Sequence, residues 1–238
     1  MNKVFLVSGN AGQGKTTIAK NLAVALRGFG FDVLLVDSDL RTPRLGHHVG
    51  TPLAGRTIQE VLLGVRKLED AVYCCPSGLK LLLSSIGAVD VPHPSVLLPK
   101  LKAIADVIIV DVPTFDKKWY DTGCDLLLVT HSDFPSVLDI KKLSKFGKVH
   151  GIVVNQFHDD GLGLSGINIE KLISLPVFGV VPYEPCFREA LHHGYSLVEF
   201  HPDLSAAVVL KQIAAKLMNL EYSSPVQPAS LLAKLGLK

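Results

Sequence analysis

Residues 4–30 read VFLVSGNAGQGKTTIAKNLAVALRGFG, and the stretch GNAGQGKT within them has the form G-x-x-x-x-G-K-[ST]. Its fixed positions are occupied by Gly9, Gly14, Lys15 and Thr16. An apolar run precedes this loop, and the residues after it place apolar side chains at helical spacing. A glycine-rich loop between a strand and a helix is the context in which this motif binds phosphate groups, so the stretch predicts a phosphate-binding loop.

The chemistry expected of this loop follows from its residue types. The glycines allow a tight turn whose backbone N–H groups point inward, and with the helix N-terminus they form an anion pocket. Lys15 is expected to contact the β- and γ-phosphates, and the Thr16 hydroxyl to bind Mg²⁺. A plain glycine turn with a solvated Lys15 is the alternative, whereas a dinucleotide site would need G-x-G-x-x-G. We therefore expect a nucleoside triphosphate here, bound by Gly9, Asn10, Ala11, Gly12, Gln13, Gly14, Lys15, Thr16 and Thr17.

The rest of the chain alternates apolar runs with amphipathic segments. The runs expected as strands are 3–8, 32–37, 79–85, 106–111, 125–130, 149–155 and 177–182. The segments expected as helices are 15–29, 57–64, 95–105, 134–145, 167–174, 186–193 and 203–219. Several strand runs are apolar throughout, as in strands covered on both faces. This alternation predicts an α/β fold with a doubly wound, mostly parallel sheet and helices on both faces.

Length and composition limit the class of protein. The chain has 238 residues, of which 48% are hydrophobic and 19% charged, so a substantial core is expected. We expect a domain built around the phosphate loop over 1–222, followed by a linker and a short amphipathic segment over 223–238. The formal net charge of +2 gives no reason to expect nucleic acid as a partner. No signal peptide or membrane span is expected, and four cysteines fit a reducing cytoplasm.

Acidic residues follow two further strands of the predicted sheet. Asp37 and Asp39 end the run DVLLVDSD, and Asp111 ends DVIIVD. Ligands of open parallel sheets bind beyond the carboxyl ends of the strands, so these carboxylates are expected to converge on the phosphate loop. Asp111 is then the partner for Mg²⁺, and Asp37 or Asp39 the group that orients water. Strand-end capping, or an ion pair with Arg41 or Arg44, is the structural alternative.

The chain resembles the MinD/ParA/Mrp class of P-loop ATPases, and MinD within it most closely. The blocks that carry the resemblance run from 3 to 219: GNAGQGKTT, VLLVDSDLRTPRLGHHVG, ADVIIVDVP, LLLVTHSDFPSVLDI, GIVVNQF, LPVFGVVPYE and REALHHGYSLVEFHP.

This resemblance implies a P-loop NTPase fold and a role for each site residue. Asp37 becomes a switch residue near the metal, Asp39 the residue that positions the hydrolytic water, and Asp111 the Walker B acid. Asn155 becomes the adenine reader, with the backbone around Pro182 along the base, although Asn155 could instead cap a strand. The resemblance implies ATP and ADP as ligands with Mg²⁺, catalysis by Lys15, Asp37 and Asp39, and metal binding by Thr16, Asp37 and Asp111. It also implies a nucleotide-dependent homodimer.

Position 10 departs from the family pattern. The family's loop usually reads K-G-G-x-G-K-T, and its first lysine contacts phosphates across a dimer, whereas this chain has Asn10. Asparagine donates a hydrogen bond but brings no charge to the γ-phosphate. Two hypotheses follow: a dimer that forms through other contacts and hydrolyses ATP slowly, or a nearly static nucleotide-bound switch.

Features outside the loop leave further alternatives open. Residues 228–238 place leucines on one helical face beside lysines. The resemblance to MinD implies that such a tail contacts an anionic membrane weakly, and a docked or disordered tail is the alternative. The expected location is therefore the cytoplasm, with peripheral contact at the inner face of the cell membrane left open. The pairs Cys74-Cys75, His47-His48 and His192-His193 lack chelating spacing. Trp119 and Tyr120 indicate either a partner surface or simple packing.

The leading interpretation is a MinD-like ATPase switch that positions partner proteins. The alternative is a metallochaperone-type ATPase that assists the maturation of nickel or iron–sulfur centres. A bacterial-type tyrosine kinase would fit DSDLRTPRL but lacks the usual C-terminal tyrosine cluster, and a ParA-type role on DNA would want a basic surface patch. The sequence does not identify the regulatory or cargo protein.

Overall fold

A computed structural model describes residues 2–51, 53–87 and 90–223, and these form one eight-stranded sheet. The strands are β1 (Lys3–Gly9), β2 (Val33–Asp37), β3 (Tyr73–Cys74), β4 (Lys80–Leu82), β5 (Val107–Asp111), β6 (Asp125–Thr130), β7 (Val149–Phe157) and β8 (Val177–Pro182). Their order in the sheet is β3-β4-β2-β5-β1-β6-β7-β8. Every pairing is parallel except that of β3 with β4. The predicted doubly wound, mostly parallel sheet is confirmed.

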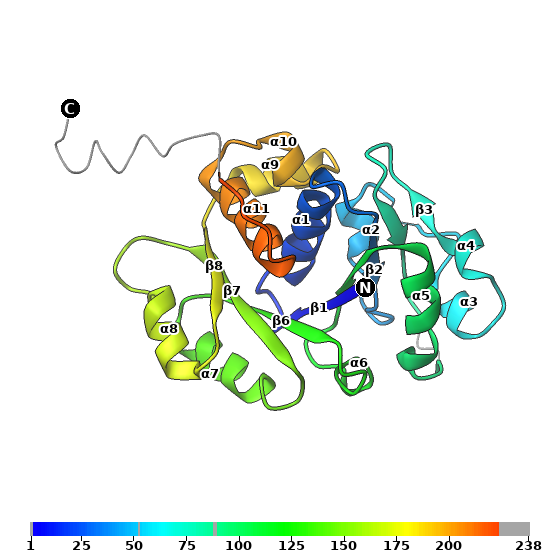
Figure 1. Ribbon diagram of the computed structural model, residues 1–238, viewed down its shortest axis with the longest axis horizontal. Coiled ribbons are helices and arrows are strands. Elements are labelled where there is room, and N and C mark those ends of the chain that lie inside the picture. The colour runs from blue at the N-terminus through cyan, green and yellow to red at the C-terminus, as the bar shows by residue number, and fades with distance from the viewer. Residues whose placement is uncertain (1, 52, 88–89, 224–238) are drawn as a thin grey trace.

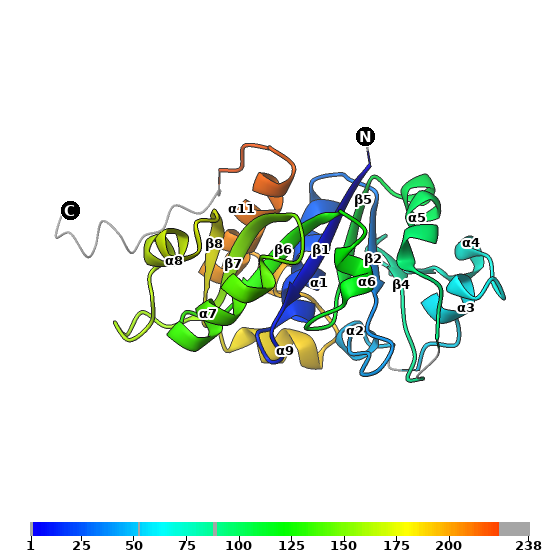
Figure 2. The ribbon, with the colours of Figure 1, turned by 90° about the horizontal axis from the view of Figure 1, so that it is seen from below.

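Helices cover both faces of this sheet (Figures 1 and 2). One face carries α1 (Lys15–Gly28), α2 (Leu45–His48), α9 (Cys186–His192), α10 (Leu197–Phe200) and α11 (Ser205–Leu217). The opposite face carries α5 (Leu98–Ile104) after the short 3₁₀ turn η1 (Pro94–Val96), then α6 (Lys117–Tyr120), α7 (Phe134–Leu143) and α8 (Gly166–Ile173). The helices α3 (Ile58–Leu62) and α4 (Leu68–Ala71) lie near β3, at one end of the sheet.

Alternate side chains of the central strands enter two separate cores. In β1, Phe5 and Val7 pack with α1 and α11, whereas Val4 and Leu6 pack on the opposite face with α5, α7 and α8. A strand buried on both faces needs apolar side chains at every position, which explains the uninterrupted apolar runs. Burial of each large aliphatic side chain contributes about 2 kcal/mol, so these two cores supply the main force that holds the strand ends in place.

Five short elements were not predicted: α2, α4, α6, α10 and β3. Each has four residues or fewer, too few for a helical or strand period to show in the sequence. The predicted longer helices and strands all exist, with ends shifted by a few residues; the helix expected over 95–105, for example, divides into η1 and α5.

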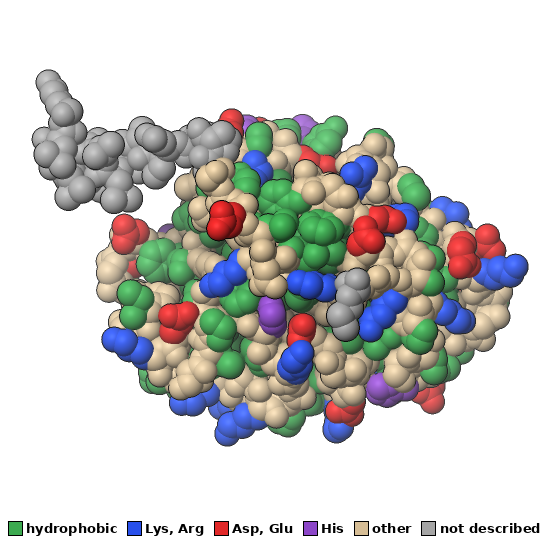
Figure 3. All heavy atoms as spheres, viewed as in Figure 1, with side chains coloured by type: hydrophobic (Ala, Val, Ile, Leu, Met, Phe, Trp, Pro, Cys, Tyr) green, Lys and Arg blue, Asp and Glu red, His purple; other side chains and the backbone are tan. Residues whose placement is uncertain are grey.

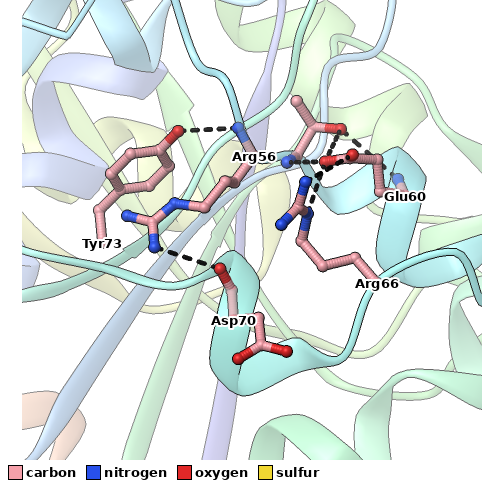
Figure 4. A network of polar contacts seen from close by, with 6 residues as sticks. Arg56, Glu60, Arg66, Asp70 and Tyr73 are labelled. Carbon is pink, nitrogen blue, oxygen red and sulfur yellow. Dashed lines mark hydrogen bonds and ion pairs between the residues drawn. The ribbon is translucent and has the colours of Figure 1, made fainter.

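Polar contacts organise the segment around α3 and α4 (Figure 4). Thr57 forms a capping box with Glu60 at the start of α3. Arg66 donates two hydrogen bonds to the Glu60 carboxylate, at 3.1 and 3.0 Å. The Arg56 guanidinium lies 4.2 Å from the ring centroid of Tyr73, and the Arg56 N–H donates to the Tyr73 hydroxyl at 2.8 Å. These local contacts hold a segment whose helices are too short to be stable alone.

The surface carries charges of both signs. In Figure 3, Lys and Arg side chains are interspersed with Asp and Glu over the face in view. None of the helices within the described residues has both the length and the apolar character needed to cross a membrane. The linker and amphipathic segment predicted over 223–238 lie outside the described residues, apart from Ser223.

Candidate nucleotide-binding site

A cleft of about 220 Å³ opens beside the N-terminus of α1. Its walls come from the loop after β1, from the segment after β2 and from the segment after β5, because the carboxyl ends of these neighbouring strands meet at one edge of the sheet. The lining residues are Ala11, Gly12, Gly14, Lys15, Thr16, Thr17, Asp39, Thr42, Arg44, His48, Asp111, Val112, Pro113 and Thr114. Eight of the residues predicted for the site are thus brought together here.

The phosphate loop has the backbone that an anion pocket requires. Gly14 precedes α1 with φ 84°, a left-handed conformation, and no side chain caps the first turn of the helix. The first N–H groups of α1 therefore face the cleft without a side-chain acceptor. Gly9 lies where no side chain fits, since a Cβ there would stand 2.1 Å from the carbonyl oxygen of Val129 in β6.

Buried polar side chains fix the far side of the loop to the sheet. Gln13 is buried, accepts a hydrogen bond from the His131 N–H and donates one to Ser136 at 3.1 Å. The Asn155 side chain at the end of β7 donates to the Gln13 carbonyl at 2.9 Å. Gln13 and Asn155 thus lie behind the loop rather than in its cleft, and they make the loop rigid before any ligand arrives.

Lys15 and Thr16 begin α1 and point toward the phosphate pocket and its acidic wall. The Lys15 ammonium donates to the Asn10 carbonyl at 3.0 Å, and burial lowers its pKa. The Thr16 hydroxyl donates to the Asp111 carboxylate at 2.5 Å. A phosphate chain can replace the Asn10 carbonyl as acceptor for Lys15, and a cation can enter between Thr16 and Asp111.

Two carboxylates at the ends of β2 and β5 are almost completely buried. Asp111 is 5% exposed, and burial raises its pKa to about 7, with the Thr16 hydrogen bond acting in the opposite direction and the Asp37 charge adding to the rise. Asp37 is 1% exposed, and burial raises its pKa to about 6. The Asp37 oxygens accept from the N–H groups of Asp39 at 3.0 Å and Leu45 at 3.2 Å. Two neighbouring buried carboxylates destabilise the fold when both are charged and no cation is bound.

The donor set at this wall fits Mg²⁺. Hydroxyl and carboxylate oxygens are ligands that magnesium prefers, and Thr16 and Asp111 supply them in the cleft lining. Asp37, also predicted as a metal ligand, lies beside Asp111 in the sheet but not in the cleft lining. Among the described residues, no ion pair joins Asp37 or Asp111 to a lysine or arginine. A divalent cation would offset the mutual repulsion of the carboxylates.

Asp39 lies on the cleft wall and is less buried than Asp37. Its carboxylate accepts from the N–H groups of Arg41 and Thr42 and from the Thr42 hydroxyl, at 2.9 to 3.0 Å. These bonds fold residues 39–42 into a turn that holds the carboxylate near the phosphate pocket. Within the described part of the chain, neither Asp37 nor Asp39 forms an ion pair with Arg41 or Arg44. Both carboxylates instead accept backbone N–H groups just after β2, as the strand-end capping alternative expects.

Six lining residues were not predicted for the site: Thr42, Arg44, His48, Val112, Pro113 and Thr114. Arg44 adds a second cation to the cleft beside Lys15, which suits a polyphosphate. The segment DSDLRTPRL contained the signal, since basic residues directly after strand-end acids of a phosphate site are placed to meet the ligand. His48 is held neutral, because burial lowers its pKa to about 4.

The residues expected around the base, Asn155 and Pro182, are not among those that line the cleft. Pro182 ends β8, next to the Asn155 end of β7 in the sheet. Tyr183 follows it and stacks on His158 with ring centroids 4.6 Å apart. The Asn155 amide is engaged with the loop, so its role as adenine reader stays a prediction.

Asn10 lies at the entrance of the loop and contacts α7. Its side-chain amide donates to the Asp139 carboxylate at 2.9 Å, and Asp139 also pairs with Lys142 at 2.9 Å. The position at which the family usually has lysine is therefore tied to the protein's own α7.

Trp119 and Tyr120 are core residues. They are 4% and 3% exposed, and the Tyr120 hydroxyl lies 2.7 Å from that of Ser8 in β1. Of the two alternatives left open by the sequence, packing is the one observed for these two side chains. Phe115 nearby is 48% exposed and packs edge-on against Tyr120 and Phe146.

Comparison with known proteins finds a family model and curated relatives that match most of this chain. The model of the CobQ/CobB/MinD/ParA nucleotide binding domain matches residues 4–197. An ATP-binding protein of Methanocaldococcus jannaschii is 32% identical, over 94% of this chain and 90% of that protein. The iron-sulfur cluster carrier protein of Synechocystis sp. is 29% identical, over 90% of this chain and 70% of that protein.

A solved structure agrees with this chain in fold. The septum site-determining protein MinD of Pyrococcus horikoshii, complexed with Mg-ADP, matches with a TM-score of 0.82 at 26% identity. The match covers 91% of this chain and 96% of that chain.

Proposed function

We propose that this chain, which belongs to the CobQ/CobB/MinD/ParA nucleotide-binding family of P-loop ATPases, is a MinD-like switch that binds and hydrolyses ATP and thereby positions partner proteins. The observation that carries the proposal is the cleft in which the phosphate loop, the two cationic side chains Lys15 and Arg44, and the strand-end acids Asp39 and Asp111 converge. The Mg-ADP bound to the Pyrococcus horikoshii MinD structure supports ATP, ADP and Mg²⁺ as the ligands.

In this proposal the residues of the cleft have separate roles in binding the nucleotide and in hydrolysing it. Loop N–H groups and Lys15 bind the phosphates, and Lys15 neutralises charge that develops on the γ-phosphate. Thr16, with Asp111 and Asp37 beside it, would hold Mg²⁺, and the ion would supply further charge neutralisation. Asp39 orients a water molecule toward the γ-phosphate, and Arg44 offers additional positive charge. Asn155 and the backbone at Pro182 form the base end of the site.

Switching requires that the ATP and ADP states differ in a contact to another molecule. We propose that the contact is a second copy of the chain, facing the cleft through the turn of residues 39–42 and the loop at Asn10. Both segments adjoin the phosphate pocket, so the γ-phosphate alters their surroundings directly. Membrane contact through residues 228–238, and the location that it implies, stay predictions, as does the regulatory or cargo protein.

Replacing Asn10 by lysine tests the dimer and catalysis together. The N10K chain is expected to hydrolyse ATP about tenfold faster than the wild type, because the added charge reaches the γ-phosphate of the facing copy. The rate per chain should rise with protein concentration, and sedimentation velocity should detect more dimer with ATP than with ADP.

The matched control for this substitution is Asn10→Ala. It removes the hydrogen bond to Asp139 without adding a charge, so its turnover should stay near the wild-type value. Equal turnover in N10K, N10A and wild type, together with identical sedimentation in ATP and ADP, would contradict the proposed switch.

A second candidate function is assistance in metal-centre assembly, which the similarity to the Synechocystis iron-sulfur cluster carrier favours. Cluster binding usually requires several thiolates at close spacing. The cysteines here are Cys74, Cys75, Cys124 and Cys186, without a C-x-x-C pair. This candidate therefore ranks second.

A further inference from the structure

A mixed cluster of side chains lies between α9 and the end of α10, outside the nucleotide cleft. Cys186 and Glu189 are three residues apart on α9 and so share a helix face. His201 follows α10 directly. The thiol, one carboxylate oxygen and one imidazole nitrogen of these residues all lie within 4.8 Å of one another. From this geometry we propose that Cys186, Glu189 and His201 bind a single Zn²⁺ ion.

The distances are close to those of a zinc site. Zinc binds sulfur at about 2.3 Å and nitrogen or oxygen at about 2.0 to 2.2 Å, so tetrahedral ligand atoms stand roughly 3.3 to 3.7 Å apart. The Glu189 oxygen and the His201 Nε2 are 4.0 Å apart. Small side-chain rotations, moving the ligand atoms by about 1 Å or less, close the site around an ion without a change in the backbone.

The chemistry of the three ligands selects the ion. A soft thiol with an imidazole favours zinc over magnesium or calcium, which prefer oxygen donors only. Glu189 is exposed, and Cys186 and His201 are half-buried, so an ion can enter from solvent and keep water as a fourth ligand. Within the described residues, no lysine or arginine pairs with Glu189, which leaves its carboxylate available.

The backbone that carries the ligands is already fixed. In α9, Ala190 is 1% exposed, and in α10 Leu197 is fully buried, so both short helices are anchored to the core. The His201 N–H donates to the Leu197 carbonyl at 2.8 Å, and the His201 ring lies 4.6 Å from that of Phe200. Little conformational entropy is therefore lost when the ion binds.

An ion at this cluster would connect two helices that are both attached to α1. The segment that joins α9 and α10 is attached to α1, because Gly194 accepts from Lys20 at 2.8 Å. In α10, the Val198 N–H donates to the Asn21 side chain of α1 at 3.1 Å. An ion that links α9 to the end of α10 therefore stabilises the cap that these helices form over α1, beside α11 (Figure 1).

Titration of the metal-free full chain with Zn²⁺, in competition with a chromophoric chelator, tests the proposal. The wild type is expected to bind one Zn²⁺ per chain and to gain thermal stability. Cys186→Ser and His201→Ala should each weaken this binding by about 100-fold or more. Co²⁺ in place of Zn²⁺ should give a thiolate-to-cobalt charge-transfer band, which Cys186→Ser should abolish.

Matched controls separate this site from the rest of the chain. Cys124→Ser removes another half-buried thiol and should leave both the Zn²⁺ affinity and the cobalt band unchanged. Circular dichroism and ATP–Mg²⁺ affinity should be unaltered in Cys186→Ser, which shows that the variant folds and that the nucleotide site is separate. A wild type that binds no Zn²⁺, a Cys186→Ser chain with wild-type affinity, or a cobalt band that Cys124→Ser removes would overturn the proposal.

Discussion

Replacing Lys15 by alanine is expected to weaken the binding of ATP–Mg²⁺ by about 100-fold, which corresponds to ~2.7 kcal/mol. The ammonium lies at the start of α1 in the phosphate cleft, and its hydrogen bond to the Asn10 carbonyl holds it close to the loop. A charge-assisted hydrogen bond to phosphate is worth about 1.5–3 kcal/mol, and alanine also leaves the phosphate charge less compensated. Isothermal titration calorimetry of both chains gives the comparison directly.

Lys100→Ala is the matched control, because Lys100 is an exposed residue of α5 on the opposite face of the sheet. It removes the same charge from the chain and should leave the affinity for ATP–Mg²⁺ unchanged. If Lys15→Ala and Lys100→Ala bound the nucleotide equally well, Lys15 would not be a phosphate ligand.

Replacing Asp111 by asparagine is expected to stabilise the nucleotide-free fold while abolishing the stabilisation that ATP–Mg²⁺ confers. Asn keeps an oxygen that accepts from Thr16 and removes a buried charge that faces Asp37. The expected gain at pH 8 is on the order of 2 kcal/mol, or about 4–8 °C in Tm for a chain of this size. The loss of magnesium binding follows because a neutral amide cannot offset the charge of the ion.

The same buried carboxyl group should make the nucleotide-free protein less stable as the pH rises. The folded-state pKa of Asp111, about 7, lies above its ordinary value of 3.8, so the folded chain binds more protons in between. The stability due to this group is complete below about pH 4 and is lost as pH rises through about 7. Asp37, with a pKa of about 6, acts in the same direction. In D111N the loss of stability between pH 5 and pH 8 should be smaller than in the wild type.

Urea unfolding at pH 5 and pH 8, with and without ATP–Mg²⁺, measures these changes. Asp203→Asn, which neutralises an exposed carboxylate, is the control and should behave as the wild type. If D111N were less stable than the wild type at pH 8 without ligand, the Asp111 carboxylate would not destabilise the nucleotide-free fold.

The sequence predicted the longer strands and helices from hydrophobic periodicity, and it predicted where the acidic residues meet from the ends of parallel strands. Residues 4–7 of β1 and 107–110 of β5 are apolar without interruption because both faces of the sheet are buried there, and this pattern is visible in the chain itself. The convergence of Asp39 and Asp111 on the phosphate loop followed from the rule that parallel strands end together. The roles assigned to individual residues came from the resemblance to MinD, and they stay predictions.

Other features depend on contacts that no short window of sequence contains. The contact of Asn10 with Asp139 joins residues 129 positions apart, and that of Asn155 with Gln13 joins residues 142 positions apart. His201 reaches Cys186 only because α10 turns the chain back along α9, and α10 has four residues. Short helices of this kind are selected by tertiary packing rather than by local propensity.

The central claim is that the loop of residues 9–17, with Lys15 and magnesium, encloses the triphosphate of ATP. Titration of ATP into the wild-type chain by calorimetry, in the presence and then in the absence of Mg²⁺, tests it most directly. The account predicts saturable heat with about one nucleotide per chain when Mg²⁺ is present, and clearly weaker binding when it is left out. No heat on titration of ATP–Mg²⁺ at micromolar protein would contradict it.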